Sequence, residues 1–324
     1  MRPFYLVSSS TICFSMLLCG AAVGQVVLQS IPLGAYDLVT LCGDIDGDGV
    51  RDIALERVAG SAPRVLDFFS MRSGQLLYHV VPPSSQSYGT AAYVGDLNGD
   101  GRADLAYMEF HPNSPAFFYH AFRSGLDGSY LHFLPWQGGV MGLGDVNGNG
   151  SDDFLLVDEM ADVGTLMNAG HSDLYDGLTG AVLRSHSGSS SMQRLGVLGV
   201  VGDLDRDGVR DYVMADTSRL YGVSAASGTV LFTLPRWSST YGEWMADAGD
   251  LDGDGFDDIV FRDRGGWPHT AYESIHVFAG PDAVRQLWSH TTWLMNRGPV
   301  YYHSHVGKIG DMDGDGHDDL GLGG

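Results

Sequence analysis

Residues 43–52 read Gly43-Asp44-Ile45-Asp46-Gly47-Asp48-Gly49-Val50-Arg51-Asp52, and this ten-residue pattern decides the fold of the chain. Five further copies follow it: GDLNGDGRAD, GDVNGNGSDD, GDLDRDGVRD, GDLDGDGFDD and GDMDGDGHDD, which begin at Gly95, Gly144, Gly202, Gly249 and Gly310. The first aspartates of successive copies are 52, 49, 58, 47 and 61 residues apart. Self-similarity at this spacing indicates one supersecondary unit that is repeated along the chain.

Short apolar runs flank the copies, for example residues 198–201 before the fourth and residues 259–261 after the fifth. They are short, rich in β-branched and aromatic residues and bounded by Gly and Asp, which favours strands. A second hairpin signal comes later in the repeats, as at Ser227-Gly228, where Gly supplies the positive φ of a tight turn. Each repeat therefore predicts four strands. Because no stretch has a 3.6-residue period, we expect almost no helix.

Four strands in each unit of about 50 residues predict an all-β fold, a β-propeller of six or seven four-stranded blades. A β-sandwich would not repeat in this way, and the repeats of a β-solenoid are usually shorter. After the sixth copy only residues 320–324 remain, where the other repeats use about 40 residues. Residues 26–31 could supply one outer strand but not a blade. We therefore expect an incomplete C-terminal blade, through truncation or an irregular ring, and an open ring would expose sheet edges.

The N-terminus has the pattern of a signal peptide. Arg2 precedes a mostly apolar stretch, and the small residues Ala22 and Gly24 suit cleavage before Gln25. We predict a signal peptide at residues 1–24, a propeller at residues 25–324, and a secreted or cell-envelope location. A lipid anchor on Cys19 is the alternative, although Leu18 stands where a small residue is expected. No later run has the roughly 20 apolar residues of a spanning helix.

The composition limits the partners. The chain has 324 residues, is 44% hydrophobic and carries a formal charge of −22, so it is globular and would be repelled by nucleic acid or an anionic membrane. Cleavage after residue 24 leaves Cys42 as the single cysteine, which excludes an intrachain disulfide. The core, metal ions or both must then stabilise the exported chain.

We number the first Asp of each copy as position 1 and name the copies loops 1 to 6: residues 44–52, 96–104, 145–153, 203–211, 250–258 and 311–319. Side chains with oxygen occupy positions 1, 3, 5 and 9 of every loop, the carbonyl of position 7 can add another oxygen, and position 6 is always Gly. In chain order the predicted ligand set is Asp44, Asp46, Asp48, Val50, Asp52; Asp96, Asn98, Asp100, Arg102, Asp104; Asp145, Asn147, Asn149, Ser151, Asp153; Asp203, Asp205, Asp207, Val209, Asp211; Asp250, Asp252, Asp254, Phe256, Asp258; and Asp311, Asp313, Asp315, His317, Asp319.

Converging carboxylates repel one another unless a cation neutralises them. Six to eight oxygen ligands in flexible geometry suit calcium better than magnesium, and no Cys or His side chain stands at a side-chain ligand position to suit zinc. We therefore predict up to six calcium ions. Loop 3, with Asn147 and Asn149, has the fewest carboxylates and should bind most weakly. Asp-Gly turns alone would not explain the same oxygen positions in six loops. EF-hands and dockerins need a ligand at position 12 in a helix, whereas a strand-like run follows here.

With these residues the chain resembles the FG-GAP or VCBS repeats of integrin α chains and of many exported bacterial proteins. Tyr88-Gly89 and Tyr241-Gly242 look like degenerate Phe-Gly elements, and Phe278-Ala279-Gly280-Pro281 resembles the Gly-Ala-Pro element. The resemblance implies a calcium loop between the first two strands of each blade, a ring of usually seven blades, and adhesion or ligand binding.

The sequence favours a non-catalytic binding or adhesion module whose partner is an extracellular protein or glycan. The alternative is a carbohydrate-active enzyme, a polysaccharide lyase or glycoside hydrolase. Its candidate acids and bases are His120, Asp158, Glu159, Glu243, His303 and His305. None of them stands in a motif with known mechanics, so no catalytic residue is assigned.

Overall fold

The computed structural model describes residues 3–8, 11–16, 26–32, 38–57, 65–80, 92–111, 114–134, 138–236, 244–265, 272–280, 282–283, 285–293, 305–308, 316–318 and 320–323. All regular secondary structure in these residues is β, which confirms the predicted all-β class, and they contain no helix that could cross a membrane. The chain divides into two compact units, Met1–Gln137 and Gly138–Gly324, which are described separately.

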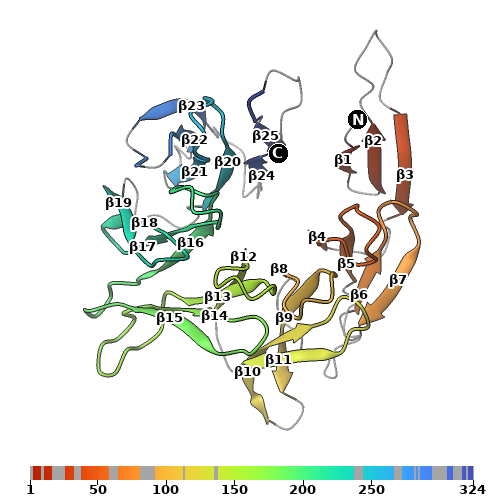
Figure 1. The fold of residues 1–324 in the computed structure, drawn as a ribbon, viewed down its shortest axis with the longest axis horizontal. Coiled ribbons are helices and arrows are strands. Elements are labelled where there is room, and N and C mark those ends of the chain that lie inside the picture. Colours follow the sequence, from red (N-terminus) through yellow and green to blue (C-terminus); the bar gives the residue numbers. More distant parts are fainter. Residues whose placement is uncertain are drawn as a thin grey trace. The chain divides into compact units, whose positions relative to one another are not determined.

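Unit 1 contains three antiparallel sheets (Figure 1). The first has three strands, β1 (Pro3–Ser8), β2 (Thr11–Met16) and β3 (Val26–Pro32). Two four-stranded sheets follow, formed by β4 (Leu38–Leu41), β5 (Ile53–Arg57), β6 (Val65–Phe69) and β7 (Leu76–Val80), and by β8 (Ala92–Gly95), β9 (Asp104–His111), β10 (Ser114–Arg123) and β11 (Tyr130–Leu134). The predicted N-terminal strand exists as β3 and pairs with β2. Since β1 and β2 lie within residues 1–24, cleavage of that segment stays a prediction.

Unit 2 contains three four-stranded sheets and one two-stranded sheet (Figure 1). The four-stranded sheets consist of β12 (Gly139–Gly144), β13 (Asp153–Asp158), β14 (His171–Tyr175) and β15 (Val182–Ser187); of β16 (Gly196–Val200), β17 (Tyr212–Ala215), β18 (Arg219–Val223) and β19 (Val230–Pro235); and of β20 (Trp244–Gly249), β21 (Asp258–Gly265), β22 (Tyr272–Phe278) and β23 (Gln286–Trp293). The last sheet pairs β24 (His305–Lys308) with β25 (Leu320–Gly323).

The order of strands in each four-stranded sheet follows the sequence, so each predicted repeat forms one antiparallel meander. Loops 1 to 5 join the first strand to the second, as predicted. The tight turns between the third and fourth strands are also where the Gly signals placed them; Gly180 and Gly228, for example, have φ of 69° and 75°.

Consecutive four-stranded sheets within each unit bury apolar side chains against one another. In unit 1, Phe68 of β6 and Leu105 of β9 belong to one buried cluster. In unit 2, Leu155 of β13 and Tyr212 of β17 share a second cluster, and Val213 of β17 and Phe261 of β21 share a third. This continuous packing fixes the ends of the first and second strands, from which the acidic loops project. Cys42 is a free thiol in the first cluster, and burial raises its pKa to about 12.

Candidate metal centre

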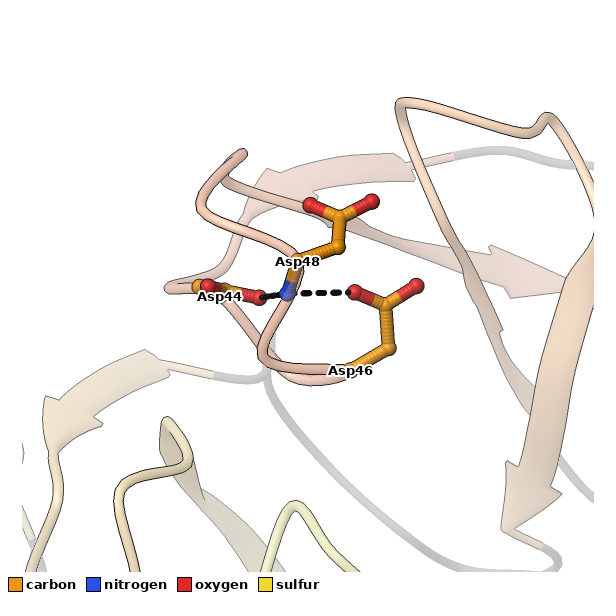
Figure 2. A group of neighbouring side chains, drawn as sticks. All are labelled: Asp44, Asp46 and Asp48. Atoms are coloured by element: carbon orange, nitrogen blue, oxygen red, sulfur yellow. Dashed lines mark hydrogen bonds between the residues drawn. The ribbon is translucent and has the colours of Figure 1, made fainter.

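The acidic loops are curled by hydrogen bonds from the backbone to their own side chains. In loop 1, Asp44 Oδ1 and Asp46 Oδ1 both accept from the N–H of Asp48, at 3.0 and 3.2 Å. Figure 2 shows these two carboxylates on either side of that N–H. Asp44 Oδ2 accepts from the N–H of Gly49 at 2.7 Å, and Asp48 Oδ1 from the N–H of Val50 at 2.8 Å. These turns bring the side chains of positions 1, 3 and 5 to one side of the loop.

Loops 1 to 5 share this geometry. The N–H of the glycine at position 6 donates to Oδ2 of position 1 at 2.7 to 2.9 Å in all five. The N–H of position 7 donates to Oδ1 of position 5 at 2.8 to 2.9 Å. The position-6 glycines have φ between 81° and 95°, a conformation that strains any residue with a Cβ. The glycine signal therefore reflects a real backbone requirement.

The donor set fits a hard divalent cation. Carboxylate oxygens of Asp44, Asp46 and Asp48 lie within 4.8 Å of one another. The same holds for Asp203, Asp205 and Asp211 in loop 4, and for Asp250, Asp252 and Asp254 in loop 5. Calcium binds oxygen at 2.3–2.6 Å, so ligands on opposite sides of one ion are about 5 Å apart. Each group is therefore close enough to coordinate a single calcium ion.

The other predicted ligands vary in what the structure shows of them. Loop 2 has Asn98 at position 3, whose Nδ2 donates to Asp100 Oδ2 at 2.9 Å. At position 7 the side chains Val50, Arg102, Ser151, Val209, Phe256 and His317 differ, so a ligand there would be the backbone carbonyl. In loop 6, Asp311, Asp313, Asp315 and Asp319 lie outside the described residues.

Loop 4 has Arg206 at position 4, where the other loops have Gly. Its φ is 63°, in the left-handed region.

Two arginines partly neutralise the loops. Arg72 Nε lies 3.1 Å from Asp48 Oδ2, and Arg285 forms an ion pair with Asp252. Both arginine side chains are largely exposed, so solvent screens these pairs and they cannot replace a bound ion.

The aspartates at position 9 have a second role that sequence reasoning missed. Asp52, Asp104, Asp153, Asp211 and Asp258 are completely buried. In each, Oδ2 accepts from the N–H of position 2 at 2.8 to 2.9 Å. Oδ1 accepts, at 2.9 to 3.0 Å, from the N–H of Met71, Gly125, Gly177, Ala225 or Gly280, after the third strand of the same sheet. Position 9 therefore joins each loop to the second hairpin.

Burial makes these aspartates weaker acids than an ordinary aspartate. Burial, together with nearby loop carboxylates, raises the pKa of Asp104 and Asp211 to about 7 and of Asp52 and Asp258 to about 6. The backbone N–H donors act in the opposite direction without cancelling the effect. The ordinary pKa of Asp is about 3.9. Without a bound cation, these carboxylates therefore bind protons more tightly in the folded chain than in the unfolded chain.

The calcium-free protein should accordingly become more stable as the pH falls from 8 to 5. A folded-state pKa above the unfolded one contributes stability that grows as pH falls through 7 and 6 and is lost as pH rises through them. With saturating calcium the trend should reverse, because protons compete with the ion for the same carboxylates. Thermal unfolding of calcium-depleted and calcium-loaded protein across this range measures both slopes. If stability changed with pH in the same direction with and without calcium, the position-9 aspartates would not be the carboxylates for which protons and calcium compete.

Loop 3 differs from the other loops through Asp176, in the turn between β14 and β15. Asp176 Oδ2 accepts from Asn147 Nδ2 at 2.7 Å and from Asn149 Nδ2 at 2.9 Å. Asp176 Oδ1 accepts from the N–H and the hydroxyl of Thr179 at 2.7 and 2.9 Å. A carboxylate has about four acceptor sites, so this one is fully used. Three other repeats have a serine at the equivalent position, namely Ser70, Ser124 and Ser224. Aligning the repeats would therefore have shown that Asp176 is different.

We predict that the triple substitution Asn147→Asp, Asn149→Asp and Asp176→Ser increases the calcium bound per chain by one at an ion concentration that leaves loop 3 empty. The change gives loop 3 the four carboxylates of loops 1, 4 and 5 and removes a like charge. Equilibrium dialysis followed by metal analysis measures the increase. Asp176→Ser alone is the control, and equal metal content in all three proteins would refute the prediction.

The candidates for acid-base chemistry are spread through the chain. His120 is buried in β10, while Glu243 and His303 lie outside the described residues. Asp158 and Glu159 line a cavity of about 310 Å³, together with Arg194, Arg236 and apolar residues. This cavity lies at the ends of β12, β13 and β16 that are remote from loops 3 and 4.

A hydrogen-bonded network on β14 and β15 was not predicted. His171 Nδ1 lies 2.8 Å from Ser187 Oγ, and His171 Nε2 lies 3.1 Å from Asp173 Oδ2. Ser185 Oγ donates to Asp173 Oδ1. His171 and Asp173 are two residues apart on β14, and Ser185 and Ser187 lie on the paired strand β15. The sequence therefore shows that His171 and Asp173 share a face but not that the serines join them. The network satisfies a buried carboxylate, which is a structural role.

Comparisons with solved structures identify the fold. The N-terminal domain of BBS1, from its complex with ARL6 soaked with mercury, superposes with a TM-score of 0.51 at 8% identity, covering 90% of this chain and 78% of that one. KlAtg21, from its complex with the coiled coil of AgAtg16, superposes with a TM-score of 0.50 at 9% identity, covering 87% and 82%. Both are propellers, so the predicted β-propeller class is confirmed. No protein-family model and no curated protein matches the sequence.

Proposed function

We propose that this chain is an exported, calcium-stabilised β-propeller of the FG-GAP or VCBS type that acts as a non-catalytic binding or adhesion module. The observation that carries the proposal is the common backbone geometry of loops 1 to 5. In loops 1 and 5 the carboxylates of positions 1, 3 and 5 lie within 4.8 Å of one another, and in loop 4 those of positions 1, 3 and 9 do. No family model matches the sequence, so the family assignment rests on the loop motif alone.

Calcium is structural in this proposal. Positions 1, 3, 5 and 9 and the carbonyl of position 7 would hold it, and position 9 also fixes the loop to the neighbouring hairpin. When bound, the ion neutralises the converging carboxylates and crosslinks the loop through its oxygen ligands. Of the 40 acidic residues, 21 stand at ligand positions, so the excess of negative charge is mainly a metal-binding framework.

An extracellular protein or glycan is the proposed partner. Both similar structures come from complexes with other proteins, which supports a protein-binding role for this fold. The cavity between the ends of β12, β13 and β16 combines an apolar lining with Arg194 and Glu159, so it can contact a ligand that has both apolar and charged groups. The charge of −22 disfavours nucleic acid as a partner.

Calcium-loaded and calcium-depleted protein should be compared on a glycan array and on the surface of cells. The proposal expects saturable binding that chelation abolishes and that Arg194→Ala weakens. Glu56→Gln, on a different sheet, is a control that should bind like the wild type. Binding that is identical with and without calcium would contradict the role of the ion in presenting the ligand surface. Mass spectrometry of the secreted protein should give Gln25 as the first residue.

One observation favours an enzyme as the second candidate function. Asp158 and Glu159 are adjacent carboxylic acids in the lining of one cavity, and glycoside hydrolysis commonly uses a pair of carboxyl groups. A screen against acidic and neutral polysaccharides tests this alternative. Turnover that Glu159→Gln abolishes without loss of folding would establish the enzyme and overturn the non-catalytic proposal.

A further inference from the structure

In three pairs of consecutive acidic loops, the second half of the later loop contacts the earlier one. We propose that loops 4, 5 and 6 bind calcium as one coupled group, that loops 1 and 2 form another, and that loop 3 is not coupled to loop 4. The inference rests on the proposed calcium sites and adds how they influence one another. It is carried by contacts at positions 5 to 8 of one loop with positions 1, 2 and 4 of the preceding loop.

Loops 4 and 5 share the most contacts. Asp257, at position 8 of loop 5, accepts through Oδ2 from the N–H of Asp203, a predicted ligand of loop 4, at 3.0 Å. Arg206 of loop 4 donates through Nε to the carbonyl of Gly255 at 2.8 Å and through Nη2 to the carbonyl of Asp254. Its guanidinium lies 3.6 Å from the ring centroid of Phe256, at position 7. Each loop therefore holds backbone groups of the other.

The same arrangement recurs between loops 5 and 6. Asp318, at position 8 of loop 6, accepts through Oδ2 from the N–H of Asp250 at 3.2 Å, and its own N–H donates to the Asp250 carbonyl at 3.0 Å. A Cβ on Gly253, at position 4, would lie 2.3 Å from the ring of His317, at position 7. Asp318 and His317 of loop 6 therefore both contact loop 5.

Loops 1 and 2 show the pattern once more. The N–H of Ala103, at position 8 of loop 2, donates to the Asp44 carbonyl at 3.1 Å. Arg102, at position 7, donates through Nη1 to the Ile45 carbonyl at 3.3 Å. A Cβ on Gly47 would lie 2.4 Å from the Arg102 guanidinium. The three pairs therefore use equivalent positions with different side chains.

Loops 3 and 4 are packed less closely than these pairs. A Cβ on Gly144, which precedes loop 3, would meet no atom within 4 Å, whereas a Cβ on the equivalent Gly202 or Gly249 would clash with Asp257 or Asp318 of the next loop. Positions 7 and 8 of loop 4 are Val209 and Arg210, and a Cβ on Gly148 would meet no atom within 4 Å. Loop 3 is therefore an internal reference for an uncoupled site in the same unit.

The coupling follows from how a bound ion orders its loop. An ion in loop 5 would hold Asp254 and the Phe256 carbonyl, and so fix Phe256 and Asp257 against loop 4. Loop 4 then loses less conformational entropy when it binds its own ion, which increases its affinity without any new ligand. Because coupling is reciprocal, an ion in loop 4 increases the affinity of loop 5 equally.

Hydrogen exchange of each loop, followed by mass spectrometry during a calcium titration, tests the inference. We expect Asp252→Ala, which removes a ligand of loop 5, to raise the calcium concentration that half-protects loop 4 by about fivefold or more, the lower range of allosteric coupling. The loop 3 midpoint should stay unchanged. Arg206→Gly with Asp257→Ala removes the contacts but keeps the predicted side-chain ligands, and Gly is the residue of the other loops at position 4. Adding Asp252→Ala to that variant should no longer shift loop 4.

A loop 4 midpoint that Asp252→Ala leaves within twofold of the wild type would overturn the coupling while leaving the calcium sites intact. Wild-type protein in which calcium protects none of the loops would overturn both the calcium sites and their coupling. Exchange in β13 and β14 checks that each variant is folded. Should Asp252→Ala fail to fold, the Arg206→Gly/Asp257→Ala protein is compared with the wild type directly. Loss of coupling then raises the midpoints of loops 4 and 5 together, and unchanged midpoints overturn the inference.

Discussion

Removal of calcium lowers the midpoint of thermal unfolding by at least about 10 °C. An ion that binds only the folded chain adds about 2.7 kcal/mol per site when its free concentration is a hundred times the dissociation constant. A large domain shifts its midpoint by roughly 2 °C per kcal/mol, so several sites together give a large change. Differential scanning calorimetry of calcium-loaded and chelator-treated protein measures it.

Magnesium provides the control for this experiment. It prefers strict octahedral geometry and retains its water, so the same concentration of magnesium should restore only a small part of the lost stability. Restoration of the full midpoint by magnesium would show that the loops respond to divalent charge rather than to calcium coordination. A midpoint that chelation does not change would remove calcium from the account of stability.

Asp211→Ala costs about 2–6 kcal/mol of stability even in calcium-free protein. Asp211 is completely buried and accepts from the N–H groups of Leu204 and Ala225 at 2.8 and 2.9 Å. Alanine leaves both donors buried without an acceptor, at about 1–3 kcal/mol each. Urea unfolding in the absence of calcium measures the loss independently of any ion.

Asp205→Ala, at position 3 of the same loop, is the matched control. Its carboxylate is partly exposed and accepts from Asp207 N–H at 3.2 Å, so the substitution should have a small effect without calcium. With calcium it should lower stability, because it removes a ligand of the loop 4 site. Equal losses for both substitutions in calcium-free protein would show that position 9 has no special structural role.

The regular features of the fold were accessible from the sequence because each depends on neighbouring residues. Gly-Asp patterns fixed the turns, apolar runs such as residues 259–261 marked strands, and loops 1 to 5 join the strands that this reading predicted. The requirement for Gly at position 6 is a local backbone property. It was therefore visible in the repeat alone.

The missed features depend on residues that are distant in the chain. Asp52 holds the N–H of Met71, 19 residues away, and Asp176 holds Asn147, 29 residues away. The contact of Asp257 with Asp203 spans 54 residues. Such pairs are brought together by sheet pairing and by packing of consecutive sheets, which a repeat motif does not encode. The sequence therefore predicted position 9 only as a ligand, without its role in joining the two hairpins.

Calcium per chain tests the central claim most directly. Protein equilibrated by dialysis against calcium at the physiological extracellular level, then analysed for metal by mass spectrometry, should contain five or six ions per chain. Asp203→Ala should contain at least one ion fewer, because it removes a carboxylate that is central to loop 4. A wild-type chain that retains no calcium above the dialysis buffer would contradict the assignment of the acidic loops as metal sites.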